Sequence, residues 1–556
     1  MTKHIAALLA CAIPLSACSG SAPSSTASSP PPAITTAAAP AAPPLFTDLG
    51  TYHKAVTTSN AEAQKYFDQG LRLMYGFNHD EAERAFREAA RLDPSLAMAW
   101  WGVAVAVGPN YNLPIDPDRN ARALDAVAKA KALAAKASDV ERGYIDAIAT
   151  RYSADPKADR GTLDLTYGNA MKQLSAKYPA DIDAAVLYAE SLMDLKPWQL
   201  WNADGTPAIG TDEILKVLEG VLARDPNHPG ANHYYIHAVE ASPKPERAMQ
   251  SAQTLKTLVP GAGHLVHMPA HIHMRIGDYQ AAIDANAQAA SVDAAYVAKT
   301  KAEGVYPMMY STHNYMFLSA AANMLGQTAQ AIDSANKAVA IIAPMAGHEP
   351  MVDAILPIGF LTLLRNEKWD DVLAAPKPAE STPLALAMWH YARGVTHALQ
   401  AKADEARKDL AAFDLAAKKV APDFVAGLSP AKDVLAVARA VLQARIASAA
   451  GNRPAAIAAW LRAVNLQDQL KYDEPADWYY PVRESLGAEY LRAKDYVKAE
   501  TVFREELVKN PGNPRAMFGA LEAMRAQGTT KDVADWTEKF NTAWKRADLK
   551  ISIDKM

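Results

Sequence analysis

Cysteine is nearly absent from this sequence of 556 residues. The two cysteines, Cys11 and Cys18, both fall within the first eighteen residues. The long remainder of the chain therefore has no disulfide bond and no thiolate ligand. Any metal ion that it binds must be held by histidine, carboxylate, methionine or water.

Positive charge is not in excess either. The chain has 57 Lys and Arg residues against 61 Asp and Glu residues, which gives a net charge of −4. Proteins that bind nucleic acid present a basic face, so we expect no nucleic-acid partner. The sequence has no motif for a nucleotide or another organic cofactor, and we expect neither.

Aromatic residues are scarce, at 8% of the chain, whereas half of the chain is hydrophobic and alanine is abundant. This composition is typical of closely packed helices rather than of a β-sandwich. The length also exceeds what one hydrophobic core usually supports. We therefore expect several helical domains or a helical repeat array.

The beginning of the chain has an apolar run, from Ile5 to Leu15, that is too short to span a bilayer. We predict a signal peptide at 1–18. Its last residues, Leu15-Ser16-Ala17-Cys18, resemble the lipobox of bacterial lipoproteins. That resemblance implies a lipid on Cys18 and, with Ser19 next to it, an outer-membrane anchor that faces the periplasm. An ordinary cleaved signal peptide is the alternative.

Residues 19–47 consist mainly of serine, proline, alanine and threonine. Such a segment buries too little apolar surface to fold, so we predict a disordered linker. Beyond it we expect an N-terminal array at 48–300, with a histidine-rich groove, and a C-terminal array at 301–556.

A repeated pattern of small, aromatic and alanine residues follows the linker. It comprises Tyr66, Gly70, Ala82, Phe86, Ala89 and Pro94, and it recurs at Leu486, Gly487, Tyr490, Tyr496, Ala499, Phe503 and Pro511. The pattern resembles the tetratricopeptide repeat (TPR) of about 34 residues, in which small residues let two antiparallel helices approach closely. Partial matches follow Gly277, Gly326, Gly394 and Gly451. We therefore expect an all-α fold, a right-handed superhelix (α-solenoid) of TPR helical hairpins.

Three segments resemble a family of exported bacterial TPR proteins. They are residues 58–71, the segment His267-Met268-Pro269-Ala270-His271, and residues 477–487. Members of this family are mostly described as TPR proteins, and some as proposed components of TonB systems. The resemblance implies an exported binding module with a protein or peptide partner in the cell envelope.

Histidine is concentrated in one stretch of the chain. Seven of the 14 histidines lie there: His228, His233, His237, His264, His267, His271 and His273. On the TPR register two neighbouring helices each present a row of side chains on one face, namely His233, His237 and Glu240 on the first, and His264, His267, His271 and Arg275 on the second. In TPR proteins these positions line the concave groove. We predict that His233, His237, His267 and His271 converge there, and that His273 points into the packing between helices.

Two adjacent helices can bring such imidazoles within reach of one metal ion. The predicted metal ligands are His233, His237, Glu240, His264, His267 and His271. Histidine with carboxylate suits Zn²⁺, whereas histidine near Met268, Met274, Met308 and Met309 suits copper. The sequence has no His-Glu-x-x-His motif, so nothing indicates a zinc protease.

Further groove residues are predicted at Glu190, Asp194, Arg275 and His313. Glu190 and Asp194 fall on the groove face of an upstream helix, either as ligands or as partners that orient an imidazole. Pro269 complicates the register, because a proline is best tolerated at the first position of a helix. A helix that begins there leaves His264 and His267 on the entering loop.

Three functions fit these observations. The favoured one is a lipid-anchored binding or assembly module that faces the periplasm and has a His-lined, metal-binding groove. The second is a Zn- or Cu-dependent enzyme on the same scaffold, with Glu240 as the general base. The third is a groove in which His233, His237, His271 and Arg275 bind a peptide or carboxylate without metal. A merely packed or solvated histidine face is the alternative without a function.

Three loops interrupt the repeat, at residues 110–117, 197–210 and 299–309. Inserted loops often lie on the binding face of a helical repeat. We expect Trp198 and Trp201 in the second loop to form a lid or plug, or to cover the end of a neighbouring helix.

Several other aromatic residues and histidines are expected to have structural roles. The isolated His348, His390 and His397 are predicted to be hydrogen-bonded core residues, and Tyr234 and Tyr235 to lie in the core. The run Trp478-Tyr479-Tyr480 is predicted to pack against the start of a helix, with an exposed aromatic platform as the alternative.

Overall fold

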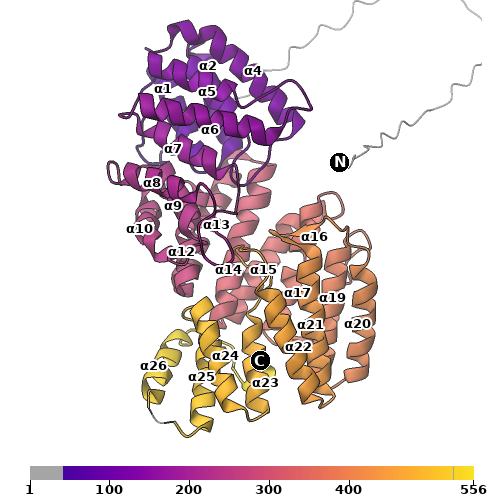
Figure 1. Ribbon diagram of the computed structural model, residues 1–556. Helices are drawn as coiled ribbons and strands as arrows, with labels where there is room; N and C mark the ends of the chain where they lie inside the picture. The colour runs from indigo at the N-terminus through magenta and orange to yellow at the C-terminus, as the bar shows by residue number, and fades with distance from the viewer. Residues whose placement is uncertain (1–41, 530) are drawn as a thin grey trace, which may run out of the picture. The chain divides into compact units, whose positions relative to one another are not determined.

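The computed structural model describes residues 42–529 and 531–556 (Figure 1). The predicted signal peptide, Cys18 and most of the predicted linker lie outside these residues. Among the described helices, none has the length and apolar character needed to cross a membrane.

The described chain is almost entirely helical. Its first helices are α1 (Ala61–Tyr75), α2 (His79–Leu92), α3 (Ala97–Ala106), α4 (Pro117–Leu133), α5 (Asp139–Ala149), α6 (Arg160–Lys177), α7 (Ile182–Met193) and α8 (Thr211–Leu222). The histidine-rich region forms α9 (Pro229–Val239), α10 (Met249–Leu258), α11 (Gly263–His267), α12 (Pro269–Ile276) and α13 (Tyr279–Thr300). A short π-helix at Tyr306–Ser311 then leads into α14 (Thr312–Leu325).

The remaining helices continue the array. They are α15 (Thr328–Ile342), α16 (Pro350–Ile355), α17 (Ile358–Arg365), α18 (Trp369–Ala374), α19 (Pro383–Leu399), α20 (Ala403–Ala417), α21 (Ala431–Ala449), α22 (Arg453–Gln467), α23 (Val482–Arg492), α24 (Tyr496–Lys509), α25 (Pro514–Ala526) and α26 (Val533–Ala543). Two short antiparallel strands, β1 (Val425–Ala426) and β2 (Ser429–Pro430), precede α21. The predicted all-α class and its TPR hairpins are confirmed.

Side chains of the sequence define many of the helix starts. Asn60 caps α1 by accepting hydrogen bonds from the amides of Glu62 and Ala63. Ser138 and Glu141 form a reciprocal capping box at the start of α5. These polar residues satisfy amide groups that the first turn of a helix leaves without partners.

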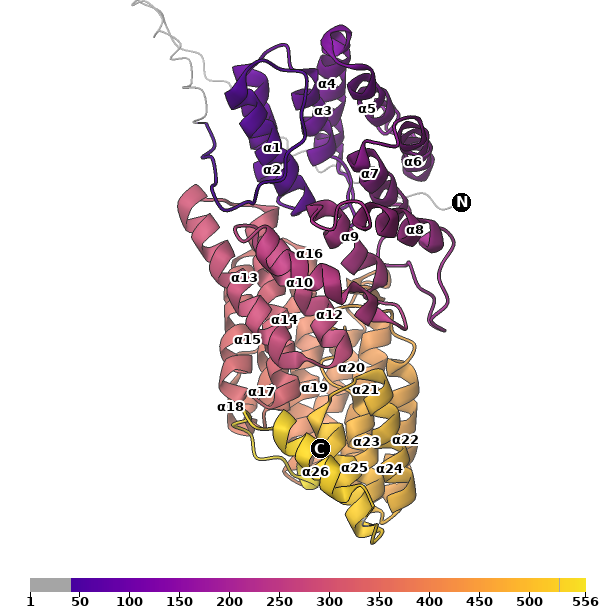
Figure 2. The same cartoon turned by 90° about the vertical axis from the view of Figure 1, so that its left-hand side faces the viewer.

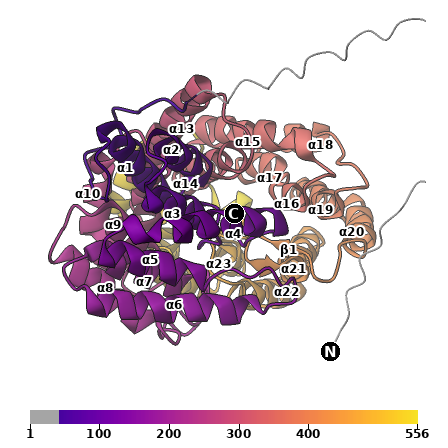
Figure 3. The ribbon, with the colours of Figure 1, turned by 90° about the horizontal axis from the view of Figure 1, so that it is seen from above.

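Consecutive hairpins pack on one another along the chain. Helices α13, α14 and α15 lie side by side, as do α19, α20, α21 and α22 (Figures 1 and 2). Seen from above, α15, α19, α21 and α22 follow a curved path (Figure 3). This nearest-neighbour packing is what a TPR array requires.

One phenylalanine in each of two hairpins fills the space that glycines leave. Phe86 of α2 is fully buried between Gly70 of α1 and Gly102 of α3. In the C-terminal array Phe503 lies in the same way between Gly487 and Gly519. The ring occupies the volume that a Cβ atom would need, which is the physical reason for the small residues of the repeat.

We expect Gly102→Ala to destabilise the protein. The added Cβ would lie 2.4 Å from Phe86 Cδ1, so the ring must move. Overpacking of this kind costs about 1–3 kcal/mol, measured as the free energy of unfolding in urea. Gly220→Ala is the matched control, because Gly220 is an exposed residue of α8 and a Cβ atom added there would meet no other atom within 4 Å. This control should gain about 0.5–1 kcal/mol from helix propensity. Equal effects of the two changes would contradict the packing role.

The predicted disordered linker ends earlier than residue 47. The Tyr66 hydroxyl donates to the carbonyl oxygen of Pro43 (3.0 Å), and the Phe46 amide donates to Gln69 Oε1 (2.8 Å). Because α1 offers these partners, the segment around Pro43 to Phe46 lies against it.

The C-terminal array folds back onto the histidine-rich region. The Tyr279 hydroxyl donates to the carbonyl oxygen of Pro511 (3.0 Å), and the backbones of Gly277 and Gly512 are in close contact. This contact brings the segment between α22 and α23 beside α9 and α12. The division between arrays at residues 300 and 301 stays a prediction.

Candidate metal centre

Three short helices place the central histidines. His233 and His237 lie one turn apart on α9, His264 and His267 lie on α11, and His271 lies on α12. As predicted, Pro269 is the first residue of α12. His264 and His267 are on a short helix of their own rather than on a loop, because α11 and α12 meet at Met268.

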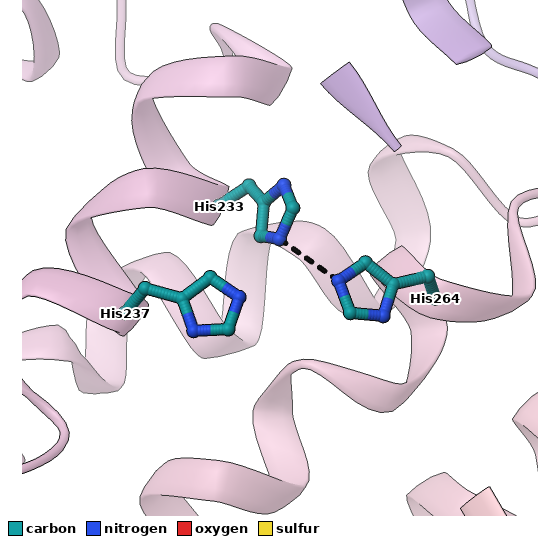
Figure 4. Close-up of side chains that lie close together, drawn as sticks. All are labelled: His233, His237 and His264. Carbon is teal, nitrogen blue, oxygen red and sulfur yellow. Dashed lines mark hydrogen bonds between the residues drawn. The ribbon is translucent and has the colours of Figure 1, made fainter. Parts of the chain in front are cut away.

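The structure divides the donor atoms into groups of three. His233, His237 and His264 form one group, which we call the first triad, and Figure 4 shows these rings facing one another. His267, His271 and His313 form the second triad, and Glu240, His271 and Glu474 form a third group. Within each group the donor atoms lie within 4.8 Å of one another.

Two pairs of imidazoles face each other through their Nε2 atoms. The Nε2 atoms of His233 and His264 are 3.0 Å apart, and those of His267 and His271 are 2.9 Å apart. Two nitrogen ligands at about 2.0–2.1 Å from one tetrahedral ion lie roughly 3.3 Å apart. The observed spacings are therefore close to those of two ligands of the same ion.

The opposite nitrogen of four imidazoles is turned to an oxygen acceptor. His233 Nδ1 lies 2.7 Å from the carbonyl oxygen of Tyr75, and His267 Nδ1 lies 2.6 Å from Asn286 Oδ1. One carboxylate serves the other two, since Glu240 Oε1 is 2.8 Å from His237 Nδ1 and Glu240 Oε2 is 2.5 Å from His271 Nδ1.

These anchors fix which nitrogen carries the proton. A carbonyl or carboxylate oxygen only accepts, so His233, His237 and His267 donate from Nδ1. His271 forms an ion pair with Glu240, and with a pKa of about 10 it carries a proton on both ring nitrogens at neutral pH. Asn286 also accepts, because its own amide group donates to the carbonyl oxygen of Ala282. In each neutral ring Nε2 then presents a lone pair toward the cluster. An imidazole held in this way by a second partner is the usual arrangement of a metal-ligating histidine.

The cluster is buried rather than spread over an open groove. His233, His264, His267 and His271 are at most 1% exposed, and His237 is 2% exposed. Burial and the charge of neighbouring histidines hold the pKa values of His233, His264 and His267 well below the usual range. These rings are therefore neutral at neutral pH, which is the form that binds a metal ion.

Glu240 and His271 titrate together. Burial opposes the charge of each group, but the facing charges of His271 and His237 lower the pKa of Glu240 to about 2. Burial lowers the pKa of His271, and the charge and hydrogen bonding of Glu240, with a smaller part from Glu474, raise it to about 10. Glu240 is thus ionised and His271 protonated at neutral pH, and the two form a buried ion pair.

Four buried polar atoms of the cluster have no hydrogen-bond partner within the described part of the chain. They are His237 Nε2, His264 Nδ1, His271 Nδ1 and Glu474 Oε2, of which His271 Nδ1 lies in an ion pair with Glu240. Buried polar groups are normally paired, and an unpaired one often marks a site for an ion. His313 is the third member of the second triad. Burial, and to a lesser degree the positive charge of His271, lowers the pKa of His313 to about 3.

Glu474 and Tyr472 are site residues that the sequence did not reveal. Glu474 Oε2 lies 3.5 Å from His271 Nδ1, and the Tyr472 hydroxyl lies 3.5 Å from Glu240 Oε2. Arg275 donates to the carbonyl oxygen of Glu240 (2.9 Å) and lies against the Tyr472 ring. The only sequence feature near these two residues is the segment 477–487, one of the three segments that resemble the family of exported TPR proteins.

Glu190 and Asp194 lie apart from the histidines. Asp194 pairs with the buried Arg151 (2.5 Å), and the charge of Asp194 acts on Glu190. Burial, with the nearby charge of Asp194, raises the pKa of Glu190 well above the usual range. The two carboxylates therefore belong to a buried ion-pair network and not to the predicted groove.

The structural predictions for other residues have mixed outcomes. Tyr234, Tyr235, Trp478 and Tyr480 are buried as expected, so the exposed aromatic platform is wrong. His390 and His397 are partly buried and both hydrogen-bond to Asp409 (3.4 and 2.8 Å). His348 is exposed, contrary to the prediction, because it follows a turn after α15. His273 is half-buried outside the cluster, near Asp278 (3.7 Å).

A cavity of about 940 Å³ opens onto the cluster. His237, His264, His271 and His313 line it, together with Arg275 and Glu474. Much of the remaining wall is apolar and rich in methionine and aromatic side chains, including Met274, Met309, Met316, Met388, Tyr279 and Trp478. This volume lies within the range of small-molecule sites.

The three inserted loops border this cavity. Asn112, Trp198 and Met309, one from each loop, line it. The ring centroids of Trp198 and His237 are 5.4 Å apart, and those of Tyr111 and His237 are 5.2 Å apart. Trp201 instead covers the end of α9, where its indole N–H donates to the carbonyl oxygen of Ala238 (2.8 Å). The two expected roles of the loop are thus divided between its two tryptophans.

Comparison with known proteins adds little. The chain matches no family model and no curated protein. Matching solved structures include a chain of the APC/C hetero-tetramer Cut9-Hcn1 (13% identity, 84% of this chain and 78% of that chain, TM-score 0.33). Yeast Tom70 also matches, with 9% identity over 86% of this chain and 93% of that chain and a TM-score of 0.29. The P58(IPK) TPR domain matches with 12% identity over 85% of this chain and 99% of that chain and a TM-score of 0.22. Similarities this weak support no conclusion about function. From its own hairpins, the chain is an all-α array of TPR-type repeats.

Proposed function

We propose that this protein is a metal-binding TPR protein whose buried histidine cluster holds a transition-metal ion, Zn²⁺ or copper. The observation that carries the proposal is the shared arrangement of His233, His237, His267 and His271. Each has Nδ1 against an oxygen atom and Nε2 turned toward the cluster. A hydrogen-bonded core histidine needs no such common direction.

The contact between His267 and His271 is a position that a proton or a metal ion can fill. The two Nε2 atoms are 2.9 Å apart. Burial lowers the pKa of His271, but the charge of Glu240 raises it to about 10, so His271 holds the proton of this contact at neutral pH and a bound metal ion would replace it. A donor set of imidazoles in an enclosed site suits zinc and copper better than Mg²⁺ or Ca²⁺, which prefer oxygen ligands.

Binding of a free peptide carboxylate is less well supported. His233, His237 and His271 are buried and already paired. The guanidinium of Arg275 donates to the carbonyl oxygens of Glu240 (2.9 Å) and Ser242 (3.3 Å). These groups would have to give up their present partners to bind a chain terminus.

The cavity favours metal-dependent catalysis as a second candidate function. Four histidines of the cluster line a volume that admits a small molecule. Glu240 is a poor candidate for the base, because both of its oxygens already lie against imidazoles. Glu474, whose Oε2 has no hydrogen-bond partner in the described structure, is better placed.

The location of the protein in the cell is part of the same proposal. The segment Leu15-Ser16-Ala17-Cys18 supports a lipid anchor on Cys18 and a location in the bacterial envelope, facing the periplasm. The TPR hairpins support a protein partner there. An outer-membrane location and a role beside TonB systems rest on the family resemblance of the sequence.

The deciding experiment measures the metal content of the untagged protein by elemental analysis. We expect the wild-type protein to retain at least one zinc or copper ion per chain, and a His237→Gln/His271→Gln variant to retain only background. His397→Gln is the matched control, since His397 also donates to a carboxylate but lies on α19. Circular dichroism verifies the fold of each variant. Equal metal content in all three folded proteins would refute the proposal.

A further inference from the structure

We infer that the cluster is a two-ion centre, with one ion bound by His233, His237 and His264 and a second, adjacent ion bound by His267, His271 and His313. This inference rests on the proposed function and goes beyond it in the number, position and coordination of the ions. The two triads use six different side chains from α9, α11, α12 and α14.

Each triad has the dimensions of one binding position. The donor nitrogens within each lie within 4.8 Å of one another, and each contains one short Nε2 to Nε2 pair, at 3.0 Å and 2.9 Å. Zinc and copper in proteins usually take about four ligands, so one ion cannot bind all six imidazoles. The donor atoms therefore define two positions.

The two positions are neighbours. The ring centroids of His237 and His271 are 5.5 Å apart, and those of His264 and His267 are 5.7 Å apart, so each pair links the two triads. Paired metal ions in proteins lie about 3.5–4 Å apart. The two-ion centre includes a small, water-derived oxygen donor as the ligand that the two ions share.

Glu240 is a second partner rather than a ligand. Two ligands of one tetrahedral ion lie roughly 3.3 Å apart, whereas Glu240 Oε2 is only 2.5 Å from His271 Nδ1, which leaves no room for an ion between them. Glu240 instead joins the triads, because it accepts from His237 of the first and lies against His271 of the second.

Each ion keeps an open coordination position on the cavity side. Three protein ligands per ion are typical of sites that exchange a fourth ligand. His237 and His264 of the first triad and His271 and His313 of the second line the cavity. An exchangeable ligand would thus reach both ions from the same cavity.

The test is a titration of metal-stripped protein with Zn²⁺ or Cu²⁺, with bound metal measured by elemental analysis after gel filtration. We expect two ions per wild-type chain and one ion in each of His264→Gln and His313→Gln. His273→Gln, a half-buried histidine outside the cluster, should still bind two. One ion per wild-type chain would overturn the inference and leave the proposed function standing, whereas none would refute both.

Electron paramagnetic resonance of the Cu²⁺ form provides a second readout, which does not depend on the number of bound ions measured by elemental analysis. Two Cu²⁺ ions in contact through a shared ligand couple magnetically, so the wild-type signal should be weak or strongly broadened. Each single-triad variant should give the signal of an isolated Cu²⁺ ion. An isolated-ion signal from the wild-type protein, or loss of both ions from either folded variant, would overturn the two-ion centre.

Discussion

Replacing Glu240 by alanine should weaken metal binding by about 10²–10⁴-fold, because this carboxylate orients two imidazoles at once and each lost second partner costs about 10–100-fold in affinity. Its two oxygens lie 2.8 Å from His237 Nδ1 and 2.5 Å from His271 Nδ1. Without them both rings are free to rotate, and the buried negative charge that favours a cation is lost. Competition with a chelator of known affinity measures the effect.

Asp409→Ala is the matched control for Glu240→Ala. The Asp409 carboxylate also bridges two imidazoles, at 3.4 Å from His390 Nδ1 and 2.8 Å from His397 Nδ1. It lies on α20, outside the metal cluster, so metal affinity should remain within about twofold of the wild-type value. If both variants bind metal as tightly as the wild-type protein, Glu240 has no orienting role.

Glu506→Gln should stabilise the protein at alkaline pH. Burial and the charge of Glu484 raise the pKa of Glu506 to about 8, although Asn510 (2.6 Å) and Asn513 (3.2 Å) donate to its Oε1. A glutamine keeps the shape and the accepting oxygen without the charge. We expect a gain of about 2–4 kcal/mol in the free energy of unfolding at pH 9, and almost none at pH 4.5.

The sign of this effect follows from the direction of the pKa shift. The pKa in the folded protein lies above the ordinary value of 4.5, so folding favours the protonated carboxyl group. Its contribution is complete below pH 4.5 and is lost as the pH rises to about 8. Urea unfolding at several pH values tests this, with the exposed Glu505→Gln as the control. Parallel pH profiles of Glu506→Gln and wild type would contradict it.

The sequence contains enough information to predict the scaffold because the repeat depends on local packing. Gly70 and Phe86 are spaced so that a ring of the second helix fills the gap beside a glycine of the first, and Gly487 and Phe503 repeat that relation. Short-range patterns of this kind can be recognised without knowing the rest of the fold. Gly102 and Gly519, which close the other side of each ring, belong to the next hairpin and were not recognised.

The candidate site was predictable only in part. Helical periodicity placed His233 and His237 on one face, and the structure brings them beside the histidines of α11 and α12. The loops that enclose the site could not be placed from periodicity: the rings of Tyr111 and Trp198, from two inserted loops, lie 5.2 Å and 5.4 Å from that of His237. A periodic pattern describes which face of a helix a residue occupies, but not what a distant loop places over that face.

Long-range contacts account for the remaining differences. Glu474 reaches His271 because the C-terminal array folds back, and no local pattern indicates that contact. Glu190 and Asp194 have the expected helical positions, yet the buried Arg151 attracts Asp194 into an ion pair away from the histidines. Both outcomes depend on the partners that the tertiary fold provides.

Anomalous X-ray diffraction at the zinc or copper absorption edge, from crystals of the metal-loaded protein, tests the central claim most directly. We predict anomalous density between the facing Nε2 atoms of the cluster, with one peak bonded to His233 and His264 and a second bonded to His267 and His271. If metal-loaded crystals show no anomalous density, or show it only elsewhere on the chain, the result would contradict a metal centre in this cluster.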